Sequence, residues 1–328
     1  MTAKPTRREA LIGMVAGGIS ASALAQTNTA HQATPKAQDH TMQHKEDGDL
    51  KSSINGATIN YSIAGEKNDH PMIVLHGGRG FGTYPGVFRT YLPLTDKYRL
   101  IGFDMRGHGY SSLTPPYTFD QIVDDIEAIR IKLGGNRKMV LLGGSFGGMI
   151  ALSYAIKYPD GLTHLCLRGT APSWQNELGA FDNFRKRAAE KAPMATEEML
   201  HKVFSPTIID DEEFRLIMYS MYPMYVADDK PIDHNAILEQ ARRGIFHAKV
   251  HNDLFADHSY DVIDTMHKIN VPTLVMCGEN DWICTPDQSR LIASKIAKSK
   301  LVVVPKSNHG VPDDIALQEV TTFLNETA

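Results

Sequence analysis

Short apolar runs recur along the 328-residue chain and alternate with stretches whose apolar residues follow helical spacing. Six of these runs predict buried strands, at residues 71–75, 98–103, 139–142, 162–167, 272–277 and 301–304. Strands that alternate with helices indicate a mostly parallel sheet with helices on both faces. The expected fold class is therefore α/β.

Turn and cap signals place the ends of several elements. Asn55-Gly56, flanked by alternating polar and apolar residues, predicts a β-hairpin before the first buried run. Thr118 with Gln121 predicts a capping box at the start of one helix, and Thr285 followed by Pro286 predicts the cap of another.

The alternation of strands and helices stops after residue 171. From 172 to about 265 the pattern is helical, and strands resume at 272. Helices inserted between two halves of a sheet indicate a lid, so we expect a core of residues 49–171 and 266–328 and a lid of residues 172–265. The lid holds a run of Met and Tyr residues, 218–225, that either lines an adaptable apolar pocket or forms an ordinary lid core.

The first residues have the pattern of a targeting segment. Arg7-Arg8 precede a weakly apolar, Gly/Ala-rich run, and a small-residue cleavage site follows at Ala23-Leu24-Ala25. This resembles a bacterial twin-arginine export signal, so we expect residues 1–25 to be a signal peptide and the protein to be periplasmic or secreted. Residues 26–48 are polar and are expected to form a disordered linker.

Composition narrows the range of partners. The formal net charge is −4, with both signs mixed along the chain, so no nucleic-acid footprint is expected and the substrate should be a small molecule or short peptide. Cys166, Cys277 and Cys284 lack metal-ligand spacing, and a Cys277–Cys284 link stays open. His247 and His251 have helical metal spacing without a third ligand, so we expect no metal, no cofactor and no membrane span. The oligomeric state stays open.

The stretch Gly143-x-Ser145-x-Gly147 has the pattern of a nucleophile elbow. It lies between an apolar strand and a helix pattern that starts directly after it. A turn this tight has no room for side chains beside the serine, so glycines flank it and the hydroxyl is held above the sheet. Ser145 is therefore the expected nucleophile.

A serine hydroxyl needs a base to take its proton and an acid to orient that base. Loops after later parallel strands converge on the same sheet edge, and they carry Asp281, with Glu279 as the other acid candidate, and His309. The order Ser145, Asp281, His309 is the order in which this architecture places a catalytic triad.

An acyl-transfer site also needs two N–H donors for the developing oxyanion. Phe146, directly after the serine, and Gly78, after the strand at 71–75, are expected to supply them. Arg79 beside this site either attracts a substrate carboxylate or points to water.

These motifs together resemble the α/β-hydrolase superfamily and, within it, the proline iminopeptidase branch. The resemblance rests on Gly143–Gly148, on His76–Gly80 with Arg79 in place of a proline, on Asp104–Gly109 and on Asp281–Ile283. Phe146 stands where that branch usually has tryptophan. The resemblance implies an α/β-hydrolase fold with a helical lid and a triad of Ser145, Asp281 and His309.

The resemblance leaves the substrate open. Iminopeptidases recognise a free amino terminus through lid carboxylates, for which Glu212 and Glu213 are candidates, although acids also suit a solvated helix start. Tyr222 is a further substrate-binding candidate. The leading hypothesis is an exported serine hydrolase that cleaves an ester or amide through an acyl-enzyme. A proline iminopeptidase is the alternative, and a catalytically silent ligand-binding protein on this fold is a more remote one.

Overall fold

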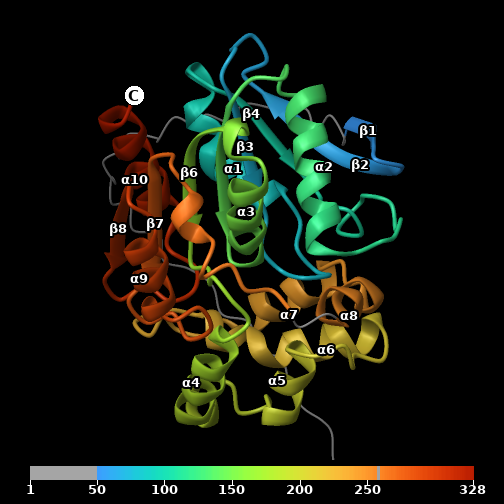
Figure 1. Ribbon diagram of the computed structural model, residues 1–328. Helices are drawn as coiled ribbons and strands as arrows, with labels where there is room; N and C mark the ends of the chain where they lie inside the picture. The colour runs from blue at the N-terminus through green and yellow to red at the C-terminus, as the bar shows by residue number, and fades with distance from the viewer. Residues whose placement is uncertain (1–49, 257–258) are drawn as a thin grey trace, which may run out of the picture. The chain divides into compact units, whose positions relative to one another are not determined.

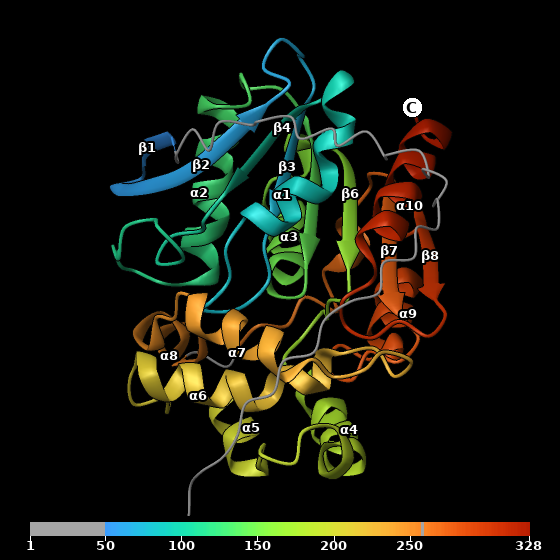
Figure 2. The same ribbon diagram turned by 180° about the vertical axis from the view of Figure 1, so that it is seen from behind.

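The computed structural model describes residues 50–256 and 259–328, so the expected signal peptide and linker lie outside the described residues. Within these residues, eight strands form one sheet in the order β1-β2-β4-β3-β5-β6-β7-β8 (Figures 1 and 2). Their bounds are β1 (Leu50–Ile54), β2 (Ala57–Ala64), β3 (Pro71–Leu75), β4 (Arg99–Phe103), β5 (Met139–Gly144), β6 (Leu162–Arg168), β7 (Thr273–Gly278) and β8 (Ser299–Val304). Strands β3 to β8 are parallel, which confirms the predicted fold class.

The first two strands form the predicted hairpin at one edge of the sheet. β1 and β2 are antiparallel, with Ile54 opposite Ala57. Asn55 and Gly56 both have positive φ, 44° and 82°, as the two central residues of a type I′ turn require. The conformation of the turn therefore matches the right-handed twist of the two strands that it connects.

Helices cover both faces of the sheet (Figures 1 and 2). These are α1 (Pro85–Tyr91), α2 (Phe119–Lys132), α3 (Phe146–Lys157), α9 (Pro286–Lys295) and α10 (Asp313–Glu326). Along β3, Ile73 and Leu75 pack into the core formed with α2, α3 and α9, whereas Met72 and Val74 pack into the core formed with α1 and α10. A strand buried on both faces reads as a continuous apolar run, which is why residues 71–75 could be identified from the sequence.

Both predicted helix caps differ from expectation in detail. Thr118 Oγ1 accepts from the Gln121 N–H at 3.2 Å, but the Gln121 side chain donates to Asp125 at 3.1 Å instead of closing the capping box. The Thr285 side chain makes no cap hydrogen bond. Pro286 at the first helical position lacks an N–H, and this alone suits it to the start of a helix.

A group of helices lies between β6 and β7 in the chain and packs beside the carboxyl ends of the strands (Figures 1 and 2). We call them the lid helices: α4 (Asn176–Lys191), α5 (Glu197–Val203), α6 (Asp211–Met221), α7 (His234–Arg243) and α8 (Ala248–Ala256). Helices α4, α5, α6 and α8 contribute to a second apolar core, which includes Phe184, Leu200 and Phe214 together with Trp282 from the loop after β7. The lid helices therefore do not depend on the sheet for all of their buried surface.

The three cysteines are buried free thiols, so Cys277 and Cys284 are not linked. Burial raises the pKa of Cys166 and Cys284 well above the usual thiol range. Within residues 50–256 and 259–328, no helix combines the length and hydrophobicity that crossing a bilayer requires.

Candidate active site

Ser145 lies at the junction of β5 and α3 in a backbone conformation that side chains rarely adopt. Its φ is 52° and its ψ is −123°. Such a residue stores roughly 1–3 kcal/mol of strain and persists only where its surroundings enforce it. Here its N–H donates to the Arg168 carbonyl at 2.9 Å, and its own carbonyl accepts from Thr170 Oγ1 at 2.7 Å.

The flanking glycines make this turn sterically feasible. A Cβ on Gly143 would collide with the carbonyl of Gly147, and a Cβ on Gly147 would collide with the carbonyl of His76. Within the described residues, the Ser145 hydroxyl makes no hydrogen bond, so it remains free to turn toward a base.

Asp281 and His309 lie side by side in the loops after β7 and β8. The His309 Nδ1–H donates to the two carboxylate oxygens of Asp281 at 3.0 and 2.9 Å. Asp281 is only 2 % exposed, and its Oδ1 also accepts from the N–H groups of Ile283 and Cys284 at 3.0 and 2.9 Å. This arrangement holds the Nδ1–H tautomer of His309 and leaves Nε2 as a proton acceptor.

Glu279, the other acid considered, has a different position. It is exposed, and its carboxylate accepts from the backbone N–H of Lys306 at 3.1 Å. It therefore supports the β8–α10 loop from outside. Of the two acids, only Asp281 contacts the imidazole of His309.

Gly78 and Phe146 present backbone N–H groups at the same place. Phe146 is the first residue of α3, and Gly78 has a φ of 82° in the loop after β3. Among the described residues, neither N–H has a hydrogen-bond acceptor. Both residues line the same cavity as Ser145, so the two donors are available to an oxyanion there.

Two buried histidines, which the sequence analysis did not single out, hold the loop that carries Gly78. His76 Nε2 accepts from the N–H of Met105 at 3.1 Å, and His108 Nε2 accepts from the N–H of Gly80 at 2.8 Å. Burial lowers the pKa of both imidazoles, that of His108 to about 3, so both are neutral acceptors at ordinary pH. Their only signal in the sequence was their place in the two glycine-rich motifs.

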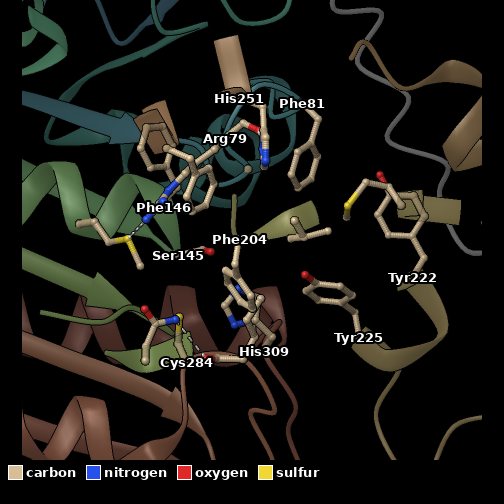
Figure 3. A pocket seen from close by; sticks show the side chains of 18 of the residues that line it. Arg79, Phe81, Ser145, Phe146, Phe204, Tyr222, Tyr225, His251, Cys284 and His309 are labelled. Carbon is tan, nitrogen blue, oxygen red and sulfur yellow. Dashed lines mark hydrogen bonds between the residues drawn. The ribbon is translucent and has the colours of Figure 1, made fainter. Parts of the chain in front are cut away.

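The main cavity lies between the carboxyl ends of the strands and the lid helices and has a volume of about 470 Å³. Figure 3 shows Arg79, Ser145 and Phe146 on one side of it and Tyr222 and Tyr225 on the opposite side. A second cavity of about 330 Å³ also reaches Ser145 and His309, next to α1 and the Arg168–Asp313 ion pair. Ser145 and His309 therefore lie where two cavities meet.

Arg79 points into the main cavity, so the alternative that it points to water was wrong. Its guanidinium carbon lies 4.1 Å from the ring centroid of Phe255 and 5.5 and 5.6 Å from those of Phe119 and Phe146. Its Nη2 donates to Met149 Sδ at 3.0 Å. Burial lowers its pKa to about 10, so it remains a cation at neutral pH.

The Met/Tyr run at residues 218–225 contributes both to the lid core and to the lining of the cavity, the two alternatives that the sequence left open. Met221 and Met224 are buried in the core of the lid, whereas Met218, Tyr222 and Tyr225 line the cavity. Burial raises the pKa of Tyr222 to about 12, so its hydroxyl stays protonated and can donate a hydrogen bond.

Glu212 and Glu213 do not line the cavity, so the structure does not support them as substrate ligands. Both lie in the first turn of α6, where acids suit the helix dipole. Glu212 is exposed and pairs with Arg215 at 3.3 Å, and Glu213 pairs with Lys202. Among the described residues, no Asp or Glu lines the main cavity.

His251 lines the cavity as a packed aromatic side chain. Its ring nitrogens lie 3.3 Å from the carbonyl oxygens of Arg79 and Lys202, and its ring packs against Phe214 and Phe255. Burial lowers its pKa to about 4. It supports the backbone of Arg79 from the lid side.

Comparisons with known proteins agree with this geometry. Residues 70–314 match the model of the alpha/beta hydrolase fold family. The chain is 40 % identical over 279 residues to Proline iminopeptidase PfmaB of Pestalotiopsis fici, covering 83 % of this chain and 98 % of that protein.

Solved structures share the fold at lower identity. The meta-cleavage product hydrolase CumD of Pseudomonas fluorescens superposes with a TM-score of 0.65 at 20 % identity, covering 86 % of this chain and 99 % of that one. The enol-lactonase of Burkholderia xenovorans gives 0.64 at 22 % identity, covering 84 % and 100 %. The family model and the 40 % identical relative show that the protein belongs to the α/β-hydrolase family and is a hydrolase.

Proposed function

We propose that the protein is a serine hydrolase that cleaves an ester or lactone through an acyl-enzyme. The observation that carries the proposal is the buried Asp281–His309 pair, which faces the same cavity as the Ser145 hydroxyl and the N–H groups of Gly78 and Phe146. Nucleophile, base and oxyanion donors thus line one cavity, and the orienting acid is hydrogen-bonded to the base. These are the parts that acyl transfer requires.

In the proposed reaction, Ser145 Oγ attacks the substrate carbonyl while His309 Nε2 takes its proton. The buried carboxylate of Asp281 stabilises the imidazolium, and the oxyanion receives hydrogen bonds from Gly78 and Phe146. His309 then protonates the departing alkoxide as the bond to the acyl carbon breaks. A water deprotonated by His309 hydrolyses the ester on Ser145 and regenerates the enzyme.

Active-site labelling tests this function. A fluorophosphonate should label wild-type protein on Ser145, and S145A should resist labelling and lose ester hydrolysis by roughly 10³-fold or more. Equal labelling of S145A, or its unchanged turnover of a short-chain aryl ester, would contradict the proposal. Resistance of the wild-type protein to labelling would favour a catalytically silent binding protein.

Proline iminopeptidase activity is the second candidate, because the relative from Pestalotiopsis fici bears that name. Against it stands the lining of the cavity, which offers a cation and no described carboxylate to an ammonium group. Turnover of a proline arylamide that is lost on N-acetylation would establish amine recognition. Turnover of aryl esters alone would rule it out.

We also propose export of the protein, on the strength of Arg7-Arg8 and the small residues that end at Ala25. Fractionation of a bacterial host should place the wild-type chain outside the cytoplasm in a shortened form. Replacement of both arginines by lysine should retain the full-length chain inside, and equal export of this variant would contradict the proposal.

A further inference from the structure

We propose that Arg79 is an anion-binding residue and that the substrate is an ester or lactone carrying a carboxylate on the same molecule. This inference rests on the serine hydrolase function proposed above. It adds a substrate class that the triad alone does not specify.

Arg79 occupies the cavity in which the proposed reaction takes place. Arg79 follows Gly78 directly in the chain and lines the same cavity as Ser145 (Figure 3). Its cation lies 5.6 Å from the ring centroid of Phe146, whose backbone N–H is an oxyanion donor in the proposed site. One small molecule in this cavity is therefore able to contact Arg79 while its carbonyl faces Ser145.

The described contacts of the cation include no anion. Three aromatic rings and the sulfur of Met149 surround it, and among the described residues it forms no ion pair with a carboxylate. The carboxylate of Glu177 raises the pKa of Arg79 through its charge, although burial lowers that pKa by more. A thioether and ring faces satisfy few of the five N–H donors of a guanidinium.

The surroundings of the guanidinium favour an anionic ligand. A charge largely removed from water is costly unless opposite charges and hydrogen-bond acceptors compensate it, and attraction between charges is stronger in an apolar cavity than in bulk water. The planar fork of a guanidinium fits the two oxygens of a carboxylate. The lining contains no described Asp or Glu, so the charge that a ligand meets in this cavity is that of Arg79, which favours an anion over an ammonium group.

Binding tests the inference independently of turnover. In the S145A background, 3-phenylpropionate should bind about tenfold or more tightly than the isosteric 3-phenylpropionamide, as measured by calorimetry. R79M, which keeps an unbranched apolar side chain against Phe255, should abolish this preference. R79K should retain part of it, because a single ammonium keeps the charge but loses the fork.

A matched control removes an arginine elsewhere. Arg290 lies on α9, with its side chain 56 % exposed, and pairs with Asp287. R290M should keep the full preference for the carboxylate. Equal binding of acid and amide by S145A, or an unchanged preference in both the R79M and R79K variants, would overturn the inference.

Kinetics locate the carboxylate and separate the two proposals. Wild type should hydrolyse 4-acetoxybenzoate better than its methyl ester, or mono(4-nitrophenyl) adipate better than its methyl ester, depending on whether the leaving group or the acyl group carries the anion. R79M should erase the selectivity by raising KM for the charged ester alone.

If wild type showed no selectivity in either pair of esters, the inference would be contradicted, while normal fluorophosphonate labelling would leave the hydrolase function intact. A carboxylate preference in binding with neither labelling nor ester turnover would contradict the hydrolase function instead.

Discussion

The two walls of the main cavity are built in different ways. On the sheet side, the wall includes backbone held in unusual conformations, with Ser145 at a φ of 52° and Gly78 at 82°. On the lid side it consists of apolar side chains projecting from or just after the helices, among them Phe204, Met218 and Tyr222. One wall positions N–H groups and a nucleophile, and the other offers shape and hydrophobic surface.

Each wall is held by correspondingly different forces. On the sheet side, buried neutral imidazoles and strand hydrogen bonds fix the turn positions, as the bond from the Gly80 N–H to His108 does at 2.8 Å. The lid is held by packing around Phe214 and by polar links from its side chains to loop carbonyls of the core, such as those of Asn183 and Arg187. Changes on the sheet side should therefore lower kcat, whereas changes on the lid side should alter KM and substrate choice.

The largest effect is expected for Asp281→Asn on the sheet side. An amide donates as well as accepts, so it favours the wrong tautomer of His309, and kcat for an aryl ester should fall about 10⁴-fold. KM should change little, and thermal unfolding checks that the fold is retained. If kcat fell by less than tenfold, the Asp281–His309 contact would not be part of catalysis.

The next effect concerns the buried histidines and pH. Burial lowers the pKa of His108 from 6.5 to about 3 and that of His251 from 6.5 to about 4. Between the lowered pKa and pH 6.5, each of these histidines is therefore protonated in the unfolded chain and neutral in the folded protein. The stability they contribute is fully present above pH 6.5 and is lost as the pH falls below it. At pH 5 each should cost roughly 2 kcal/mol of unfolding free energy.

Urea unfolding at pH 7.5 and pH 5 measures this loss. His108→Gln keeps an acceptor for the Gly80 N–H without a titrating ring, so the difference between the two pH values should shrink by roughly 2 kcal/mol relative to wild type. An unchanged difference would mean that His108 is not neutral and buried in the folded protein.

The contrast between the two walls also explains which parts of the site could be identified from the sequence. Residues 71–75 and 139–142 are buried on both faces, so their pattern identified the strands. Ser145 is marked by the glycines its turn requires. For these positions the constraint is local, so sequence reasoning reached them.

The features of the site that the sequence did not reveal depend on packing between distant segments. The orientation of Arg79 is set by Phe255 and Met149, which lie far along the chain. Glu212 and Glu213 were candidates because acids were expected in the lid, but a helix start accounts for them. A helical pattern shows which face is apolar, but it does not show which apolar side chains meet the substrate and which meet each other.

Asn308 is a polar link between the two walls and should give an intermediate effect. Its Nδ2 donates to the carbonyl oxygens of Met224 and Val226 at 2.8 and 3.0 Å, and its Oδ1 accepts from the His309 N–H at 2.9 Å. Asn308→Ala leaves the Met224 carbonyl without a described donor and leaves the Val226 carbonyl with Lys191 as its remaining described donor. Unfolding should therefore become easier by about 1–3 kcal/mol, and kcat should fall about tenfold.

Asn308→Asp separates these roles, because it keeps the acceptor for His309 and loses both donors to the lid. If the lid link matters, this variant should behave like Asn308→Ala in thermal unfolding. Wild-type stability in both variants would show that the base loop holds its position without the lid.

The smallest effect should come from the lid wall itself. Phe204 lines the cavity and packs against Phe181, with ring centroids 5.8 Å apart. Phe204→Ala removes apolar surface from bound substrate but leaves the reacting groups in place, so KM for a bulky aryl ester should rise roughly three- to tenfold while kcat stays within about twofold. Leu216→Ala, on the exposed side of α6, is the matched control and should change neither constant. A fall in kcat as large as that of Asp281→Asn would show that the lid wall helps to position the reacting groups, and the separation of the two walls would then be wrong.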